Sequence, residues 1–507
     1  MNKLFLALCF LLFANILPAQ RIYYSDIEKD DYRQMNFEII GKVGGNINIY
    51  KNYRNRNDIA VYFNDMKLKS KTKLEFMPDR VYNVDFVAYP DFYYMIYQYQ
   101  KRNVMFCAMV KMNGEGKLMT DPVVLDTSQL PSTNESKVYT TVASDDKQKI
   151  MVFKINKKNE KSFLLTTLLY NNHLELQKKS NITMSGSARE DLFTDFLLDN
   201  DGDLVFGRCG RTGNRDYINN FDLVLKRANE DTLQYTNFPL TDKTLDEIKI
   251  KPDNTNKNII FSSFYYKQKR GNIDGLYSVI WDKNDRKVLT DVTFPFGDTL
   301  RMDARSDNSS LKVAFNDYFI KQIIPTRDGG YAVLAELYYT TSRASGWSRY
   351  DYLYGYNSFM PYDYYYSPYG GLNNYYRGWD PYNRYGSATR HFAENIMIFY
   401  FNKAGNLVWS NAIRKTQFDD NTDMYLSYQL FNTGSEVRIL FNQLERRERM
   451  LNSVTANASG EIKKDPTLRN LDKGYEFMPR FGKQVGLKEI VLPCMNRNYI
   501  CFAKLDF

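Results

Sequence analysis

The sequence is poor in the residues that most metal sites and proton relays require. Its 507 residues include 2 His, 4 Trp and 5 Cys, and the histidines are His173 and His391. Two histidines leave little room for a multi-histidine metal site or a histidine-based relay. Tyr and Phe are abundant instead, with 41 and 33 copies. We therefore expect no metal, no cofactor and no catalytic residues.

Long apolar runs are also missing. The longest, from Leu4 to Phe13, follows Lys3 and leads to Leu17-Pro18-Ala19-Gln20, which is the pattern of a secretory signal peptide. The run is too short to cross a bilayer. We expect residues 1–20 to be a signal peptide and the exported protein to have no transmembrane segment of its own. The Ala-Gln ending resembles the signals of envelope proteins of the Bacteroidota.

Cysteines are too few for a disulfide scaffold. Four follow the predicted signal, at Cys107, Cys209, Cys494 and Cys501. Cys494 and Cys501 flank Asn496-Arg497-Asn498, which predicts a hairpin tip. The two side chains would then face each other across two strands and could form a disulfide, with two buried thiols as the alternative. The sequence leaves this open.

One local pattern recurs along the chain, in which a β-rich run ends in a polar turn and a second β-rich run follows. The turns begin at Asn64, Asn113, Asn171, Asn229, Asn284, Asn402 and Asn457. Their spacings are 49, 58, 58, 55, 118 and 55 residues, which indicates a period near 55 with one long insertion. Asn and Gly recur there because tight hairpins require a positive φ.

The repeat predicts an all-β fold, a β-propeller of four-stranded antiparallel blades. The first strands of the blades are expected near residues 37, 82, 138, 192, 246, 318, 426 and 477, which gives eight blades, with seven as the alternative. Two or three β-sandwiches are the competing architecture. We expect residues 21–507 to form a single domain. The last repeat lacks a fourth strand, and Arg21–Asp26 is suited to supply it and close the ring.

Basic residues are concentrated in the predicted connections between the second and third strands of the blades. Basic side chains outnumber acidic ones in every connection considered, and propeller geometry brings all of these connections to one face. This predicts a basic face that attracts an acidic partner. Polar loops that simply collect Lys and Arg are the alternative. The predicted binding residues are Arg54, Arg56, Lys101, Arg102, Arg208, Arg211, Arg215, Lys269, Arg270, Arg446 and Arg447.

The long insertion, at about 340–393 in the predicted sixth blade, belongs to the same face. Of the 36 residues from 350 to 385, 13 are tyrosine, interleaved with Gly and Pro. A loop of this length in a compact domain is usually functional or disordered, and Tyr dominates many binding loops. A low-complexity ornament is the alternative. The predicted binding residues are Tyr352, Tyr354, Tyr356, Tyr364, Tyr365, Tyr366, Tyr369, Tyr375, Tyr376 and Trp379.

Motifs of known propeller enzymes are not found. The four Trp show no blade period of the quinoprotein type, Thr326-Arg327-Asp328-Gly329-Gly330 lacks the Trp of a sialidase box, and Trp281-Asp282 stands alone as a WD pair. Asp199-Asn200-Asp201-Gly202-Asp203 is similar to a calcium loop, but its Gly falls too early for an EF-hand. An ordinary hairpin turn is the favoured interpretation. A carboxylate pair for glycoside cleavage stays open.

These observations favour a non-enzymatic protein-interaction module of the bacterial envelope. The expected partner is an envelope or outer-membrane protein complex, by analogy with accessory or plug subunits of Bacteroidota outer-membrane translocons. We expect the periplasm, or the periplasmic side of the outer membrane, as its location, with the extracellular space as the alternative, and no nucleic acid as partner. The competing hypothesis is a carbohydrate-active protein that binds or cleaves an acidic polysaccharide through the same face.

Overall fold

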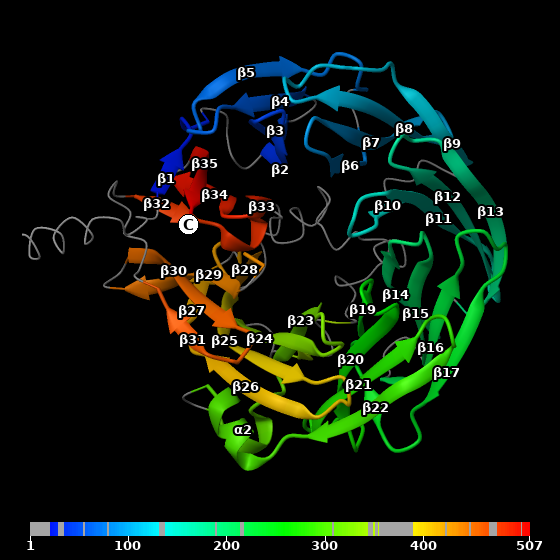
Figure 1. The fold of residues 1–507 in the computed structure, drawn as a ribbon, viewed down its shortest axis with the longest axis vertical. Helices are drawn as coiled ribbons and strands as arrows, with labels where there is room; N and C mark the ends of the chain where they lie inside the picture. Colours follow the sequence, from blue (N-terminus) through cyan, green and yellow to red (C-terminus); the bar gives the residue numbers. More distant parts are fainter. Residues whose placement is uncertain are drawn as a thin grey trace, which may run out of the picture.

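The computed structural model places seven β-sheets in a ring (Figure 1). It describes residues 21–28, 35–53, 56–78, 81–130, 137–187, 190–212, 217–306, 309–342, 348–349, 353, 389–420, 423–434, 436–445, 448–465, 474–497 and 499–507. The predicted signal peptide lies outside these ranges. Within the described ranges, no helix has the length and apolar character needed to cross a membrane.

The first three sheets each contain four consecutive antiparallel strands. They are β2 (Met35–Val43), β3 (Asn46–Tyr53), β4 (Arg56–Tyr62) and β5 (Leu68–Lys73); β6 (Asn83–Ala88), β7 (Phe92–Lys101), β8 (Val104–Asn113) and β9 (Val123–Gln129); and β10 (Thr140–Ala143), β11 (Lys149–Asn159), β12 (Ser162–Asn171) and β13 (Leu176–Ser185). In each sheet the first strand lies near the centre of the ring and the fourth at its rim (Figure 1). This is the predicted arrangement of a β-propeller.

The next sheet has nine strands, because the short β18 joins two four-stranded ladders by pairing with both β16 and β20. Its strands are β14 (Asp191–Leu198), β15 (Leu204–Arg211), β16 (Ile218–Lys226), β17 (Gln234–Pro239), β18 (Thr244–Leu245), β19 (Lys249–Asp253), β20 (Asn258–Tyr266), β21 (Gly275–Asp282) and β22 (Lys287–Pro295). If this sheet is divided at β18 into two four-stranded groups, the ring has the predicted eight blades. The blade number stays a prediction.

Two further sheets follow a short helical connection made by α2 (Asp298–Ala304) and η2 (Leu311–Val313). The first contains β23 (Tyr318–Pro325), β24 (Tyr331–Ser342), β25 (Thr389–Phe401), β26 (Leu407–Ile413) and β27 (Gln417–Asp420), and the second contains β28 (Tyr428–Asn432), β29 (Glu436–Glu445), β30 (Glu448–Asn457) and β31 (Ile462–Lys464). The predicted first strands near residues 318 and 426 thus correspond to β23 and β28.

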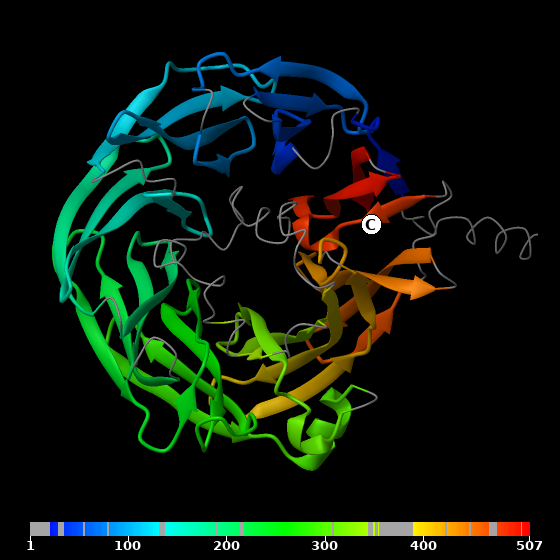
Figure 2. The same cartoon turned by 180° about the vertical axis from the view of Figure 1, so that it is seen from behind.

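The last sheet brings the two ends of the chain together. It contains β32 (Tyr475–Phe477), β33 (Lys483–Gly486), β34 (Glu489–Asn496) and β35 (Tyr499–Asp506), with η4 (Pro479–Phe481) between β32 and β33. Its outer strand is β1 (Arg21–Tyr24), which pairs antiparallel with β35 from Arg21↔Asp506 to Tyr24↔Ala503. Both views show β1 beside β35 (Figures 1 and 2). The predicted closure by the N-terminal strand is therefore confirmed.

The hydrophobic core lies in layers between neighbouring sheets. Each layer combines residues from two adjacent four-stranded groups, as where Phe261 of β20 contacts Phe221 of β16 and Phe238 of β17, each with ring centroids 4.8 Å apart. Tyr and Phe fill such wide layers because each buries a large apolar area. The abundance of aromatic residues therefore serves the packing between sheets as well as any binding surface.

The predicted polar turns join the third and fourth strands, and four of them share one hydrogen-bond pattern. In each, the Asn side-chain oxygen accepts bonds from the backbone N–H groups two and four residues later. In the turn that begins at Asn402, these donors are Ala404 and Asn406, at 3.0 and 3.1 Å, and Gly405 has a φ of 77°. The recurring Asn therefore reflects a hydrogen-bonded turn between the third and fourth strands.

Candidate functional site

The insertion emerges from the two longest strands, β24 and β25. Their pairing continues outward to Ser342↔Thr389, and β27 adds a third strand by pairing with Arg390–Ala393. Both strands therefore extend further into the expected range of 340–393 than the sequence predicts. We call these paired ends the stalk of the insertion: residues 338–342, 389–393 and 417–420.

Aromatic and charged contacts stabilise the stalk. The rings of Tyr339 and Phe392 stack with centroids 4.6 Å apart and planes 6° from parallel. Arg390 forms two hydrogen bonds with the carboxylate of Asp420, at 2.7 and 3.1 Å, and its guanidinium lies 4.9 Å from the ring centroid of Phe418. Contacts of this kind fix two long strands in one orientation, so the insertion starts from a defined position.

Arg349 is the insertion's strongest described contact with the rest of the protein. Its buried guanidinium forms an ion pair and two hydrogen bonds with Asp246, lies 3.2 Å from Glu247 and donates a hydrogen bond to the carbonyl of Tyr318. It also stacks on Phe319, 4.1 Å from the ring centroid. Burial would lower the pKa of Arg349, but Asp246, Tyr266 and Glu247 together outweigh burial and raise the pKa well above its usual value.

Leu353 adds an apolar contact close to Arg349. It is buried in a cluster with Phe319, Tyr338, Ala393 and Leu426, which come from β23, from the stalk and from the segment before β28. Arg349 and Leu353 are therefore buried in contacts that involve three successive sheets. The predicted binding residues Tyr352, Tyr354, Tyr356, Tyr364, Tyr365, Tyr366, Tyr369, Tyr375, Tyr376 and Trp379 lie outside the described residues, so their role stays a prediction.

Four of the predicted basic residues are exposed. They are Lys101 at the end of β7, Arg102 in the β7–β8 connection, and Lys269 and Arg270 in the β20–β21 connection. Arg56 is exposed but bonded to Asp58 at 2.8 Å. Arg54, Arg215, Arg446 and Arg447 lie outside the described residues.

Arg208 and Arg211 have a different setting, because β15 continues to Arg211 and both lie within a strand. Arg208 forms two hydrogen bonds with Asp191, at 3.0 and 3.1 Å, and also faces Asp222 at 3.9 Å. Its charge is thus largely compensated inside the protein. The exposed basic side chains on this predicted face are Lys101, Arg102, Lys269 and Arg270.

Four ionisable groups from the first, second, third and last sheets influence one another. They are Glu38 on β2, Asp85 on β6, Lys137 before β10 and Lys483 on β33. Burial raises the pKa of Glu38 to about 8, with Asp85 adding to the shift while Lys483 and Lys137 oppose it. A carboxyl group that keeps its proton near neutral pH can act as a general acid. Sequence reasoning missed this cluster, since its members are far apart in the chain.

We predict that replacing Glu38 with Gln makes stability less dependent on pH. The raised pKa means that the unfolded chain ionises first as the pH rises from about 4.5, so stability is fully present below this pH and is lost up to about pH 8. The Gln variant lacks this titration and should gain roughly 1–3 kcal/mol relative to the wild type between pH 5 and pH 8. Urea unfolding at both pH values measures the difference, and parallel pH profiles would contradict the assignment.

Other buried carboxylates near the inner strands are paired with cations. Glu336 lies 2.9 Å from the buried ammonium of Lys415, and Asp423 forms two hydrogen bonds with Arg480, at 2.7 and 2.8 Å. Paired carboxylates of this kind stabilise local structure and are poor candidates for acid–base chemistry. Glu336 and Asp423 both have lowered pKa values, in contrast to Glu38.

The Asp199–Asp203 segment, which is similar to a calcium loop, is occupied by a lysine side chain. The ammonium of Lys283 bonds to Asp199 and lies 2.6 Å from Asp201 and 3.1 Å from Asp203. Gly202, with a φ of 87°, closes a hairpin turn between β14 and β15. Among the described residues, no group of three or more His, Cys, Asp or Glu side chains is placed to hold a metal ion. The hairpin interpretation therefore agrees with the structure.

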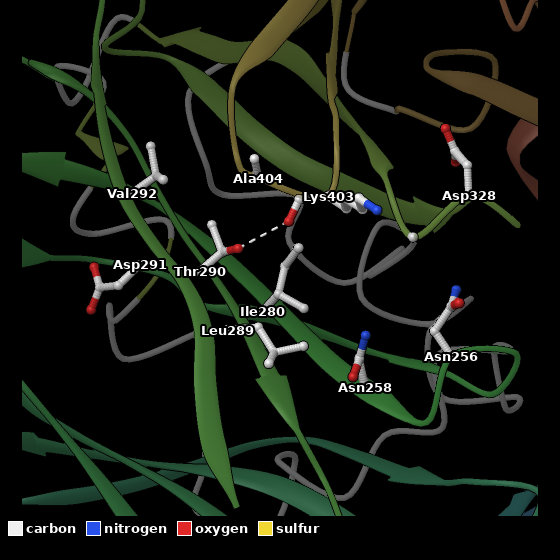
Figure 3. Close-up of a pocket in the computed structure, with 11 residues that line it drawn as sticks. Asn256, Asn258, Ile280, Leu289, Thr290, Asp291, Val292, Asp328, Lys403 and Ala404 are labelled. Carbon is white, nitrogen blue, oxygen red and sulfur yellow. Dashed lines mark hydrogen bonds between the residues drawn. The ribbon is translucent and has the colours of Figure 1, made fainter. Parts of the chain in front are cut away.

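A pocket of about 720 Å³ lies between the β19–β22 ladder and the β23–β26 sheet (Figure 3). Its polar lining includes Asn256, Asn258 and Asp328, and Thr290 beside them donates a 3.0 Å hydrogen bond to the carbonyl of Lys403. Asp328 follows the end of β23, whereas Arg349 binds at Tyr318, the start of that strand. The pocket and the root of the insertion therefore lie at opposite ends of β23.

Comparisons with known proteins give no family. No protein-family model and no curated protein matches the sequence. Similar solved structures include an ulvan lyase, described as a new family of polysaccharide lyase, with 10% identity over 82% of this chain and 90% of that chain and a TM-score of 0.36. Prolyl oligopeptidase B from Galerina marginata has 8% identity over 92% of this chain and 56% of that chain, with a TM-score of 0.41.

A third similar structure, of a eukaryotic initiation factor, shares 7% identity over 95% of this chain and 90% of that chain, with a TM-score of 0.36. Identities and TM-scores this low assign neither a family nor an activity to the protein. The function must therefore be argued from the chain's own residues.

Proposed function

We propose that this protein is a non-enzymatic interaction module of the bacterial envelope that binds a partner protein through its Tyr-rich insertion. The observation that carries the proposal is the anchoring of the insertion by Arg349, which is buried against Asp246, Glu247 and Phe319. Burying a charge costs free energy unless the charge is fully paired. A loop without a function would not require a buried, ion-paired anchor of this kind. The anchor therefore supports a functional insertion.

The stalk supports the same proposal. By holding both ends of residues 343–388 in fixed strands, it lowers the entropy that the insertion loses when it binds. Tyrosine contributes large contact areas with few rotatable bonds, so a segment with this composition suits a protein surface. The exposed Lys101, Arg102, Lys269 and Arg270 would add electrostatic attraction to an acidic partner.

We infer an exported location from the sequence. Residues 1–20 have the pattern of a secretory signal peptide. A role as an accessory or plug-like subunit of an outer-membrane protein complex, seated on its periplasmic side, fits a ring-shaped protein with one Tyr-rich insertion. The alternative location is the extracellular space.

Co-purification from native envelope extract tests this proposal. We would compare the wild type with a variant in which residues 354–388 are replaced by a short Gly/Ser linker. The exchange leaves Arg349, Leu353 and the stalk in place, so the anchor and the fold are preserved. We expect an outer-membrane complex to copurify with the wild type and at least tenfold less of it with the variant.

A matched control replaces Lys269 and Arg270 with Ser, which leaves the insertion intact. This control should retain the partner at low salt and bind it more slowly, because exposed charges act mainly on association rate. Thermal unfolding of each variant verifies that the ring is intact. Equal recovery of the partner with and without residues 354–388, or no partner with the wild type, would rule out the proposal.

A carbohydrate-active function is the second candidate, and the Glu38 cluster favours it. Glu38 with its pKa near 8, the neighbouring Asp85 and the cations Lys137 and Lys483 could bind and cleave an acidic glycan. Incubation with acidic polysaccharides, followed by size analysis of the products, tests this role. Cleavage that is lost in Glu38→Gln and kept in Asp65→Asn, an exposed carboxylate, would favour it, and no cleavage with the wild type would exclude it.

A further inference from the structure

The two cysteines of the closing sheet lie opposite each other on adjacent strands. Cys494 on β34 and Cys501 on β35 are direct partners in the antiparallel register, between Pro493↔Phe502 and Met495↔Ile500. Opposed residues in such a pair have Cα atoms about 4.5–5.5 Å apart, which falls within the range that a disulfide spans. The backbone therefore needs no rearrangement to accommodate a covalent bond.

The side chains are aimed at each other. The two sulfur atoms lie 2.7 Å apart, and no other described cysteine is near, since Cys107 lies on β8 and Cys209 on β15. Sulfur atoms at this separation are well inside the contact distance of two thiols, which favours a bond between them. We propose that Cys494 and Cys501 form a structural disulfide that joins β34 to β35 in the exported protein.

The surroundings show when this bond must form. Both cysteines are fully buried among Phe477, Leu492 and Ala503. Burial, together with the neighbouring Cys501 sulfur, raises the pKa of the Cys494 thiol well above its usual value, so the folded protein holds little of the reactive thiolate. The exchange therefore takes place before the closing sheet packs against β28–β31, while the hairpin is still accessible.

The chemistry is a thiol–disulfide exchange with an external disulfide, such as an oxidised dithiol protein of the periplasm. The Cys494 thiolate attacks one oxidant sulfur and releases the other as a thiolate. The Cys501 thiolate then attacks the Cys494 sulfur and forms the Cys494–Cys501 bond. This step breaks the mixed disulfide and releases the oxidant sulfur that was bonded to Cys494, also as a thiolate. The two protons lost by the cysteines pass to the reduced oxidant, so one disulfide is exchanged for another.

The position of the bond gives it a role in ring closure. β35 pairs with β34 on one side and with β1 on the other, so a covalent link at Cys501 holds the strand onto which the N-terminal strand docks. The proposal is independent of the binding role of the insertion. It requires only that the chain passes through an oxidising compartment, as residues 1–20 predict.

Thiol counting by mass spectrometry tests this inference on the exported wild-type protein. The protein is unfolded in guanidinium and alkylated with iodoacetamide, once without and once with prior reduction. We expect two alkylated cysteines without reduction, Cys107 and Cys209, and four after it, with a peptide cross-linked between Cys494 and Cys501 before reduction. Four alkylated cysteines without reduction, or a bond that involves Cys107 or Cys209, would overturn the assignment.

A stability measurement separates a structural bond from an incidental one. In the exported wild type, reduction should lower the Tm by roughly 2 °C, given a closed loop of this size in a large domain. The Cys494→Ser/Cys501→Ser double variant should show no such shift. An unchanged Tm on reduction of the wild type would exclude a structural role for the bond.

Discussion

Replacing Lys283 with Met is expected to lower the free energy of unfolding by about 3–5 kcal/mol. The ammonium is buried and holds three carboxylates, Asp199, Asp201 and Asp203. Asp203 keeps an ion pair with Arg227, and Asp201 keeps one with Lys257, but no other cation among the described residues forms an ion pair with Asp199. Burial would lower the pKa of Lys283, yet its hydrogen bonds to Asp199 and Asp201, together with the charges of Asp199 and Asp203, outweigh burial and raise it.

Urea unfolding of Lys283→Met measures this effect, with Lys287→Met as the matched control. Lys287 follows the same turn, but its side chain is 73% exposed and lies 3.9 Å from Asp285. Its replacement should change stability by less than about 0.5 kcal/mol. The deficit of Lys283→Met should shrink at pH 5, where the orphaned Asp199 can take up a proton. Equal midpoints for the two variants would show that the three carboxylates do not depend on Lys283.

Removal of residues 21–28 is expected to destabilise the ring by the order of 5 kcal/mol and to promote aggregation. The deletion exposes the edge of β35, which β1 covers through four paired residues. It also removes Glu28, the ion-pair partner of Lys51, whose ammonium is buried. Size-exclusion chromatography and thermal unfolding of the chain without residues 1–28, compared with the chain that begins at residue 21, measure both effects.

A graft at the other end of the chain provides the control. Because Arg21 pairs with Asp506, a short turn after Phe507 followed by a copy of residues 21–28 would form a hairpin with β35 in the native register. The grafted variant should recover most of the lost stability, whereas a graft of the same composition in scrambled order should not. Full stability of the deleted chain without any graft would contradict the closure mechanism.

Local sequence signals predicted the architecture of the protein well. The Asn turns mark the ends of third strands because their side chains bond to their own backbone, a property that depends on a few neighbouring residues. The first strand that the repeat predicts near residue 192 is β14 (Asp191–Leu198). The missing fourth strand at the chain's end pointed to Arg21–Asp26, of which Arg21–Tyr24 forms β1, since a propeller sheet needs its outer strand. Turn and strand positions of this kind depend mainly on neighbouring residues, so the sequence alone predicts them.

The ion pairs of the candidate site could not be predicted in the same way. Arg349 meets Asp246 across 103 positions of the chain, and Lys283 meets Asp199 across 84. Nothing in the residues around either cation distinguishes it from an exposed Lys or Arg, because only the fold brings the partners together. The same holds for Glu38, whose raised pKa results from burial and from Asp85 on the next inner strand.

Strand boundaries explain the differences among the basic residues. The sequence predicts connections at Arg208 and Arg211, but Gly207 and Gly210, which usually weaken strands, are accommodated within β15. Gly207 is packed tightly, since an added Cβ would lie 2.9 Å from the ring of Phe221. The predicted strand therefore ended too early, and Arg208 was placed in a connection although it lies in β15 and pairs with Asp191.

Site-specific photo-crosslinking tests the central claim that the Tyr-rich insertion contacts the partner. A photoreactive benzoyl-phenylalanine at position 365, in place of Tyr365, is compared in native envelope extract with the same group in place of Phe63. Phe63 is aromatic, 46% exposed and located in the β4–β5 turn. We expect a defined cross-linked envelope protein with position 365 and none with position 63. Crosslinks from position 63 alone, or from neither position, would contradict the proposed role of the insertion.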